Sequence, residues 1–288
     1  MKLKISVAVI IVILLVGIYF LSDIEKFLDK NKIINLESQI KEIPVADSIF
    51  KVIVPIDKLF VDSNSKTITY QEANFELKPE LSELYQEIGN YNEIKNTVVI
   101  YPTFTETAYS ENGFYDYYEE KCDSSCLSVP IKSNFEGEYA SSRASYQTLE
   151  LLNYKIISDI DVDQNPDILS NYENIILLHN EYVTKKIFNA IISHQNVIYL
   201  YPNALYAEIE VDYEKNIITL IRGHGFPKSN IDNGFNWEDD NTRPYEFDNV
   251  CKDWEFHKID NGYMLNCYPE YIIFKDTNML KTIKNLNK

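Results

Sequence analysis

The residues with the clearest chemical potential stand at the end of an apolar run. In ILLHNEYVTK (176–185), His179 and Glu181 follow the run and are separated by one residue. If the strand continues through them, both side chains point to the same side. An imidazole beside a carboxylate can act as general acid and base, or the two can share a metal ion. His179 and Glu181 are therefore our candidate catalytic residues.

The four residues HNEY (179–182), which we call the tetrad, also fit a purely structural role. Asn180 or Thr184 could cap the helix that follows, and Glu181 could interact with the positive end of that helix. His179 could then be a buried, hydrogen-bonded core residue. H-x-E is a short pattern, so its spacing does not decide between the two interpretations.

The other histidines and the nucleophiles are weaker candidates. His194 is expected at a helix end, His257 in a strand, and His224 in a loop where the sequence offers no partner for it. H-x3-H, HExxH and G-x-S-x-G are all absent. The acidic segment SDIDVDQ starts like a calcium loop, but Gln164 and Ser170 stand where an EF-hand requires Gly and Glu.

Alternating strands and helices must position the tetrad. Apolar runs of strand length alternate with segments of helical periodicity, and the connections between them are short. This order predicts an α/β fold with an open, mostly parallel sheet flanked by helices. Ligands collect beyond the carboxyl ends of such strands, where residues 179–182 would lie. The expected strands are 96–102, 154–159, 173–179 and 196–202, and the expected helices are 78–90, 139–153 and a stripe that starts at Val183.

The flanking regions are expected to add further strands. Residues 49–75 read as strands, and 205–212 with 215–223 predict a hairpin. DIDVDQNPD (159–167) reads as an acidic loop. The polar stretch 222–250 predicts a long ordered loop over the sheet that could cover a site. The end of the chain, 254–274, suggests two or three more strands.

The N-terminus predicts a membrane anchor. Ile5–Leu21 is uncharged and would span roughly 25 Å as a helix, near the short limit for a bilayer. Lys2 and Lys4 precede it, so positive-inside bias puts the bulk of the chain outside the cell. We expect a single-pass signal anchor in the cell membrane; a cleaved leader is the alternative. The expected organisation is an anchor (1–22), a linker (23–48) and an extracytoplasmic domain (49–288) with a core at 96–210 and a β-rich extension at 211–288.

Composition narrows the classes of partner. The formal net charge is −17, so nothing offsets the repulsion of phosphate groups and we expect no nucleic-acid binding. Only 8 glycines are present, and neither GxGxxG nor GxxxxGK[ST] occurs. With 22 tyrosines, any single Tyr is weak support for a function.

The four cysteines form two sequence-local pairs. Cys122 and Cys126 make C-x3-C, and Cys251 and Cys267 lie near the end of the chain. For an exported chain we expect disulfides within these pairs. A zinc site built from all four thiolates is the alternative, although structural zinc usually uses two short-spaced ligand pairs.

Several motifs of the core occur in the order seen in a known family. They lie in LNYKIISDIDVDQNPDILSNYENIILLHNEY, in the strand that ends near N-xx-Y, and in TETAYSENG (105–113). Over roughly residues 96–210 the chain resembles the C-terminal domain of the large subunit of N,N-dimethylformamidase, whose core is flavodoxin-like, as in class I glutamine amidotransferases. The matching residues are Thr105, Ala108, Tyr109, Tyr154, Asp159, Asp161, Pro166, Leu169, Tyr172, His179, Glu181, Tyr182, Asn203 and Tyr206.

The resemblance implies a hydrolase of C–N bonds with a mononuclear iron. It would make Glu181 a carboxylate ligand, Tyr109 a tyrosinate ligand and His179 the acid/base, with Asn203 and Tyr182 binding a small-molecule substrate. Hard oxygen ligands suit ferric iron. The chain departs from the family in three respects: no tyrosine clearly matches the second tyrosinate, HQN (194–196) replaces a Gly-Gly pair, and the chain is much shorter.

Two main hypotheses follow. The first is a membrane-anchored extracytoplasmic amidohydrolase-like domain; the second is a non-catalytic surface binding or assembly module with the same fold. A sensor ectodomain ranks third. The first requires Tyr109, His179 and Glu181 to converge within a few ångströms, whereas the substrate and the oligomeric state stay open.

Overall fold

The computed structural model describes most of the chain after the N-terminal region. The described residues are 40–61, 68–70, 72–91, 96–132 and 142–286. The predicted anchor at Ile5–Leu21 and the linker up to residue 39 lie outside these ranges. In the part of the chain that is described, no helix is both long enough and apolar enough to cross a membrane.

The chain divides into two compact units. The smaller comprises Met1–Ile43 and Ile53–Ala73, and the larger comprises Pro44–Val52 and Asn74–Lys288. In the smaller unit, β3 and β4 pair antiparallel. Strand β2 (Phe50–Pro55) runs from one unit into the other. The other elements of the smaller unit are β1 (Ile40–Ile43), the 3-10 turn η1 (Ile56–Lys58), β3 (Leu59–Val61) and β4 (Ile68–Tyr70).

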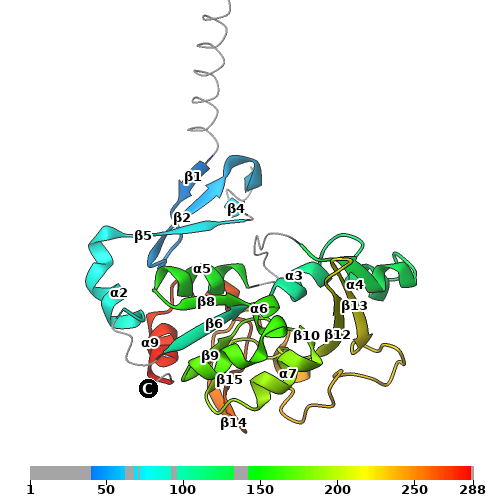
Figure 1. Ribbon diagram of the computed structural model, residues 1–288. Helices are drawn as coiled ribbons and strands as arrows, with labels where there is room; N and C mark the ends of the chain where they lie inside the picture. Colours follow the sequence, from blue (N-terminus) through cyan, green and yellow to red (C-terminus); the bar gives the residue numbers. More distant parts are fainter. Residues whose placement is uncertain (1–39, 62–67, 71, 92–95, 133–141, 287–288) are drawn as a thin grey trace, which may run out of the picture. The chain divides into compact units, whose positions relative to one another are not determined.

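A six-stranded sheet forms the centre of the larger unit (Figure 1). Every neighbouring pair in it is parallel except β14 with β15, which confirms the predicted α/β class with a mostly parallel sheet. Strand β9 is buried along its whole length, as expected for a strand covered on both faces. In order across the sheet the strands are β14 (Phe256–Ile259), β15 (Gly262–Leu265), β11 (Val197–Tyr199), β9 (Asn174–Leu177), β6 (Thr97–Tyr101) and β8 (Lys155–Ser158).

A second sheet of four strands lies in the same unit. Its edge strand β10 (Tyr182–Thr184) begins directly after Glu181. The HNE segment (179–181) therefore connects the carboxyl end of β9 to the second sheet. Strands β12 and β13 form the predicted hairpin. The order across this sheet is β10 (Tyr182–Thr184), β12 (Ala207–Asp212), β13 (Ile217–Arg222) and β7 (Ser128–Pro130).

Helices flank the sheets in the larger unit. Helix α7, for instance, buries Ile187, Phe188 and Ile191 along one face. The α-helices are α2 (Ser82–Ile88), α3 (Thr103–Ala108), α4 (Phe114–Tyr118), α5 (Arg143–Leu151), α6 (Asp159–Gln164), α7 (Lys185–Ile192), α8 (Thr242–Tyr245) and α9 (Thr277–Leu286). The remaining elements are β5 (Asn74–Leu77) and the 3-10 turns η2 (Pro79–Leu81), η3 (Ser124–Leu127), η5 (Pro166–Asn171) and η6 (Pro269–Tyr271).

Three local predictions are wrong. The acidic stretch 159–167 is mostly helical rather than a loop: Ser158 and Asp161 form a capping box that starts α6 (Asp159–Gln164), and η5 begins at Pro166. Val183 belongs to β10, and the helix starts only after Thr184, whose side chain accepts a hydrogen bond from the Ile187 N–H. The end of the stretch expected to form strands is not a strand: Tyr271 ends η6, and residues 272–276 lead into α9, a helix that was not predicted.

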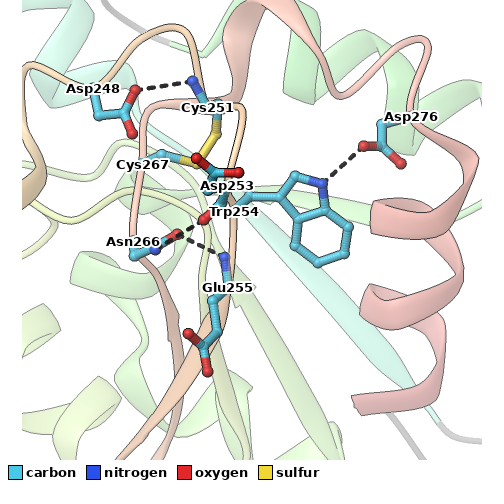
Figure 2. Close-up of a disulfide and its surroundings, with 8 residues drawn as sticks. All are labelled: Asp248, Cys251, Asp253, Trp254, Glu255, Asn266, Cys267 and Asp276. Carbon is cyan, nitrogen blue, oxygen red and sulfur yellow. Dashed lines mark hydrogen bonds between the residues drawn. A yellow bond between two sulfur atoms is a disulfide. The ribbon is translucent and has the colours of Figure 1, made fainter.

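Both predicted disulfides are present. Cys122 pairs with Cys126 and Cys251 with Cys267, which leaves no thiolates for the alternative zinc site. Around the second disulfide, the Asp248 carboxylate accepts from the Cys251 N–H at 3.0 Å (Figure 2). Two disulfides are typical of a protein that matures in an oxidising, extracytoplasmic compartment.

Candidate active site

The backbone of the HNE segment is held in place by two hydroxyl groups. Thr105 Oγ1, on α3, accepts hydrogen bonds from the N–H groups of Glu181 (3.0 Å) and Tyr182 (3.2 Å). Ser142 Oγ, at the start of α5, accepts from the His179 N–H at 2.9 Å. These bonds satisfy buried donors where the chain leaves one sheet for the other, and they direct the side chains of the segment.

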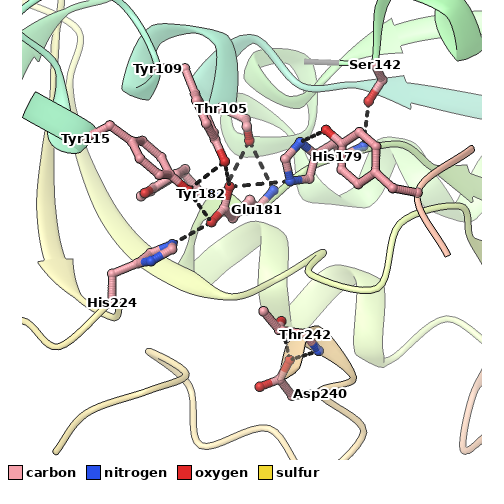
Figure 3. A network of polar contacts seen from close by, with 11 residues as sticks. Thr105, Tyr109, Tyr115, Ser142, His179, Glu181, Tyr182, His224, Asp240 and Thr242 are labelled. Carbon is pink, nitrogen blue, oxygen red and sulfur yellow. Dashed lines mark hydrogen bonds and ion pairs between the residues drawn. The ribbon is translucent and has the colours of Figure 1, made fainter. Parts of the chain in front are cut away.

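The Glu181 carboxylate is the centre of the site (Figure 3). Its side chain is fully buried, and each oxygen faces one histidine and one tyrosine. Tyr109 Oη donates to Oε2 at 2.9 Å, and His179 Nε2 lies 3.3 Å from the same oxygen. At Oε1 the partners are His224 Nε2 (2.5 Å) and Tyr115 Oη (3.3 Å). The two phenol oxygens are 2.6 Å apart.

The charges around this carboxylate decide its protonation. Burial on its own would raise the pKa of Glu181, but His224 and His179 outweigh burial and lower the pKa below its ordinary value. Burial and the charge of Glu181 raise the pKa of both Tyr109 and Tyr115. The site therefore combines an ionised carboxylate with two neutral phenols, whose two protons are shared among the three contacts that join Tyr109, Tyr115 and Glu181.

His224 comes from the long loop after β13. It adopts a left-handed conformation (φ 51°) between Gly223 and Gly225, which both have positive φ. The rings of Tyr118 and Tyr182 stack on the imidazole with centroids at 5.0 and 5.6 Å. The side chain is 17% exposed, so this histidine connects the buried carboxylate to the surface. The expectation that His224 has no partner is wrong.

His179 lies on the opposite side of the carboxylate, and it is almost completely buried. Its Nδ1 is 2.9 Å from Tyr268 Oη, and the Tyr201 ring stacks on it with centroids 5.3 Å apart. Tyr201 in turn donates to the buried Glu270 carboxylate. The two histidines thus reach one carboxylate from different surroundings, one enclosed and one near the surface.

The structure brings together most of the residues singled out from the sequence. Tyr109, His179 and Glu181 converge, and the Tyr182 ring lies against His224. Asn203 is fully buried in the loop after β11, and its side-chain amide has no hydrogen-bond partner among the described residues. Its predicted role in substrate binding stays a prediction.

Four residues of the site were missed. His224 could have been suspected, because a histidine between two glycines lies in the loop predicted to cover the sheet. Tyr115 had no distinguishing signal among 22 tyrosines. Tyr268 and Glu270 lay in a stretch assigned to strands.

The side chains of the site that could bind a metal ion offer phenol and carboxylate oxygens. Over the described ranges, no group of three or more His, Cys, Asp or Glu side chains is arranged to hold a metal ion. A cation would therefore need the phenol oxygens of Tyr109 and Tyr115 together with Glu181. The two phenol oxygens are 2.6 Å apart, Tyr109 Oη lies 2.9 Å from Glu181 Oε2, and Tyr115 Oη lies 3.3 Å from Glu181 Oε1. Metal–oxygen bonds of about 2.0 Å separate adjacent ligands by about 2.8 Å, so neighbouring oxygens of this set have spacings near those of ligands to a small hard cation.

Comparison with known proteins adds no assignment: no family model and no curated protein matches the chain.

Proposed function

We propose that the Glu181 cluster is the active site of a hydrolase that cleaves C–N bonds of the amide type. The observation that carries the proposal is the convergence of Tyr109, from the end of α3, with His179 and Glu181 of the HNE segment. Tyr109 Oη is 2.9 Å and His179 Nε2 is 3.3 Å from the same carboxylate oxygen. A fold alone would not require an ion pair and a phenol at one buried carboxylate.

Each residue has a role that its contacts support. Glu181 keeps its charge, so it orients donors and holds positive charge rather than accepting a proton. His224 Nε2 is bound tightly to Glu181 at 2.5 Å, whereas His179 Nε2 is 3.3 Å away. His179 is therefore the less tightly held of the two; in its protonated, imidazolium form it would pass the Nε2 proton to a leaving amine nitrogen and remain as a neutral imidazole. Tyr109, Tyr115 and His224 are partly exposed and form the side from which a substrate would enter.

Iron remains part of the proposal. Tyr109, Tyr115 and Glu181 would hold it, and Tyr115 takes the place of the second tyrosinate that the sequence left open. A bound ferric ion would supply Lewis-acid polarisation of the amide carbonyl. In the protein without the ion, burial raises the pKa of both phenols, so the phenols release their protons only when a cation compensates the charge.

We also propose a relationship for the core of the protein and a cellular location. The parallel sheet, the HNE segment at its carboxyl edge and the TETAY segment of α3 support a flavodoxin-like, dimethylformamidase-related core. The two disulfides and the apolar stretch 5–21 support a domain that is tethered to the cell membrane and faces an oxidising compartment.

One observation favours the second hypothesis, a non-catalytic module. The Glu181 side chain has no exposed surface, and both of its oxygens already have protein partners. A carboxylate saturated in this way can serve as an internal ion pair that holds the loop 222–250 against the sheets. In that case Glu181 would stabilise a binding surface and would perform no chemistry.

Metal analysis of the full chain, purified in detergent, tests the enzyme proposal. Ferric iron should bind at one equivalent and give a visible tyrosinate-to-iron charge-transfer band. Tyr109→Phe, Tyr115→Phe and Glu181→Gln should each lose the band or most of the iron. Tyr117→Phe is the matched control, because Tyr117 lies on the same helix as Tyr115 and packs against Phe226 with ring centroids 6.1 Å apart.

Hydrolysis is measured separately, with a panel of small primary, secondary and tertiary amides. The iron-loaded protein should release amine from at least one of them, and His179→Gln should reduce the rate about 100-fold or more. If the protein binds no iron and cleaves no amide while Tyr117→Phe and the wild type are folded alike, the non-catalytic hypothesis replaces the proposal.

A further inference from the structure

One buried acid of the core is not used by the proposed chemistry. Asp159, the first residue of α6, is fully buried at the carboxyl end of β8. Its Oδ2 accepts a hydrogen bond at 3.0 Å from the backbone N–H of Phe104, which lies 55 residues away in the chain. The fold explains this contact, because β8 runs parallel to β6 and Ser158 pairs in register with Tyr101. The helices that follow these two strands, α6 and α3, therefore begin side by side (Figure 1).

Asp159 supplies an acceptor that the start of α3 lacks. The first N–H groups of a helix have no acceptor inside the helix, and the side chain just before the helix often accepts from one of them. The residue before α3 is Pro102, whose side chain has no acceptor atom. Phe104 is fully buried, so water does not compete for its N–H. The α6 helix has its own cap in Ser158, so the Asp159 carboxyl group is available to cap α3 from another part of the chain.

Helix α3 carries two contacts to the Glu181 site. Thr105 Oγ1 accepts from the N–H groups of Glu181 and Tyr182. Tyr109, directly after the last residue of the helix, donates to Glu181 Oε2 (Figure 3). The backbone connects the two, because the Tyr109 N–H donates to the Thr105 carbonyl at 3.1 Å. The position of this short helix therefore determines where both side chains meet the HNE segment.

The state of the Asp159 carboxyl group suggests how to replace it. Burial raises its pKa to about 8, so near neutral pH the group is mostly the neutral acid. A neutral carboxyl group keeps a carbonyl oxygen that can accept from an N–H group. Asparagine has nearly the same shape and the same acceptor, whereas leucine has the shape without the acceptor. Asp159→Asn and Asp159→Leu therefore form a matched pair.

We propose that Asp159 is a positioning residue that holds α3 in place by accepting from the Phe104 N–H. Through α3 it sets where Thr105 supports the HNE segment and where Tyr109 meets Glu181. The importance of this placement for iron binding and hydrolysis rests on the proposed function. The placement itself does not, because it depends on contacts within the protein without metal or substrate.

Amide hydrogen exchange, resolved by residue on the full chain in detergent, tests the proposal. In Asp159→Leu the Phe104 N–H loses its acceptor and α3 is no longer held. The N–H groups of Glu181 and Tyr182 should then exchange about 10-fold faster or more, relative to the N–H of Ile176. Ile176 is fully buried in the central strand β9 and reports general loss of stability. Asp159→Asn keeps the acceptor and should retain the relative rates of the wild type.

One result would overturn the proposal. If Glu181, Tyr182 and Ile176 accelerate equally in Asp159→Leu, the carboxyl group contributes to stability without positioning the site. Asp159→Ala also lacks an acceptor and adds no bulk, so it replaces Asp159→Leu if the leucine variant does not fold. The same two outcomes then decide the question.

Asp163 provides the matched control, since it is a second buried aspartate of α6. Its Oδ1 accepts from the Thr184 hydroxyl, and Thr184 Oγ1 accepts from the Ile187 N–H at the start of α7. Asp163→Leu should therefore speed exchange at Ile187 and leave the rate at Glu181 unchanged relative to β9. Faster relative exchange at Glu181 in both variants would mean that loss of any buried carboxyl group in α6 disturbs the site, and it would overturn the specific role of Asp159.

The exchange experiment needs neither iron nor an amide substrate. If the protein binds no iron, and Asp159→Leu speeds exchange at Glu181 and Tyr182 beyond that at Ile176, the hydrolase is refuted and the positioning role is kept. If the protein binds iron and cleaves amides, but the three N–H groups accelerate equally in Asp159→Leu, the hydrolase is kept and the positioning role is refuted.

Discussion

Two buried glutamates, Glu181 and Glu270, invite direct comparison: Glu181 faces the His179 imidazole directly, and Glu270 binds Tyr201, whose ring stacks on that imidazole. Their exposed fractions are 0% and 3%. Each carboxylate interacts with four groups. Glu181 faces two histidines and two phenols, whereas Glu270 accepts from the N–H groups of Ala144 and Ser145, the Ser145 hydroxyl and Tyr201.

The pKa values of the two carboxyl groups are nevertheless shifted in opposite directions. Burial raises the pKa of Glu270, and its neutral donors lower the pKa by less than burial raises it. Burial acts on Glu181 as well, but two imidazoles overcome it and its pKa is lowered. The charge of the partners, and not their number or the degree of burial, therefore decides the direction in which each pKa is shifted.

The difference explains how one protein can use similar side chains for separate tasks. Glu181 keeps its negative charge, which can face a protonated side chain or bind a cation. Glu270 binds the start of α5 and orients Tyr201, for which a favourable set of hydrogen bonds is sufficient. Tyr201 links the two, because it donates to Glu270 and stacks on the imidazole that faces Glu181.

Removal of one imidazole should produce the largest effect. In His224→Phe, the ring can still stack between Tyr118 and Tyr182, but Glu181 loses its shortest ion pair. Loss of one partner of a buried ion pair destabilises a protein by about 3–5 kcal/mol. The free energy of unfolding, measured with denaturant near neutral pH, should fall by about that amount.

A histidine outside the site provides the control for that change. His194, at the end of α7, interacts with the Tyr172 carbonyl and with no carboxylate that the structure describes. His194→Gln should cost about 1 kcal/mol or less. Equal losses for the two variants would mean that His224 does not compensate the charge of Glu181.

Local patterns in the sequence predicted much of the fold. The strands of the central sheet were found because buried strands are continuous apolar runs, and β9 is one of them. The errors have local physical causes. A capping box turned the acidic stretch at Asp159 into a helix, and α9 follows an aspartate, Asp276, that accepts from the N–H groups of Asn278 and Met279.

The site was predictable only where its residues are adjacent in the chain or belong to a known motif. His179 and Glu181 are two residues apart, and Tyr109 was suggested by the resemblance. His224 and Tyr268 lie 43 and 89 residues from their partners in the site. No periodicity or composition encodes such contacts, because they depend on how the loop after β13 and the C-terminal segment pack onto the sheet.

The pH dependence of the unfolding free energy should distinguish Glu270 from Glu181. The pKa of Glu270 is raised above its ordinary value of 4.5, so the folded protein binds this proton more tightly than the unfolded chain. Its contribution to stability is present below pH 4.5 and is lost as the pH rises through the raised pKa. For Glu181 the sign is opposite: the contribution is present above pH 4.5 and is lost as the pH falls toward the lowered pKa.

Glu270→Gln tests this sign. The amide keeps the shape but has only one acceptor oxygen, so we expect a loss of about 1–3 kcal/mol at acidic pH. As the pH rises, the difference between wild type and variant should shrink, because only the wild type loses the contribution of Glu270. Asp159, whose pKa is raised to about 8 by burial, is present in both proteins and cancels in the difference. A difference that grows with pH would contradict the assignment.

The smallest expected effect concerns a single neutral donor of Glu270. Ser145 contributes its hydroxyl at 2.9 Å and its backbone N–H at 3.2 Å; Ser145→Ala removes the hydroxyl, including its 2.6 Å contact with Tyr201 Oη, and keeps the N–H. A neutral hydrogen bond contributes about 1 kcal/mol, and three donors to Glu270 remain, so the unfolding free energy should fall by about that amount. The exposed Ser170, whose hydroxyl donates to the Asp167 carbonyl, is the matched control, and Ser170→Ala should be nearly neutral. A loss in Ser145→Ala as large as that in His224→Phe would erase the distinction between charged and neutral partners on which the comparison rests.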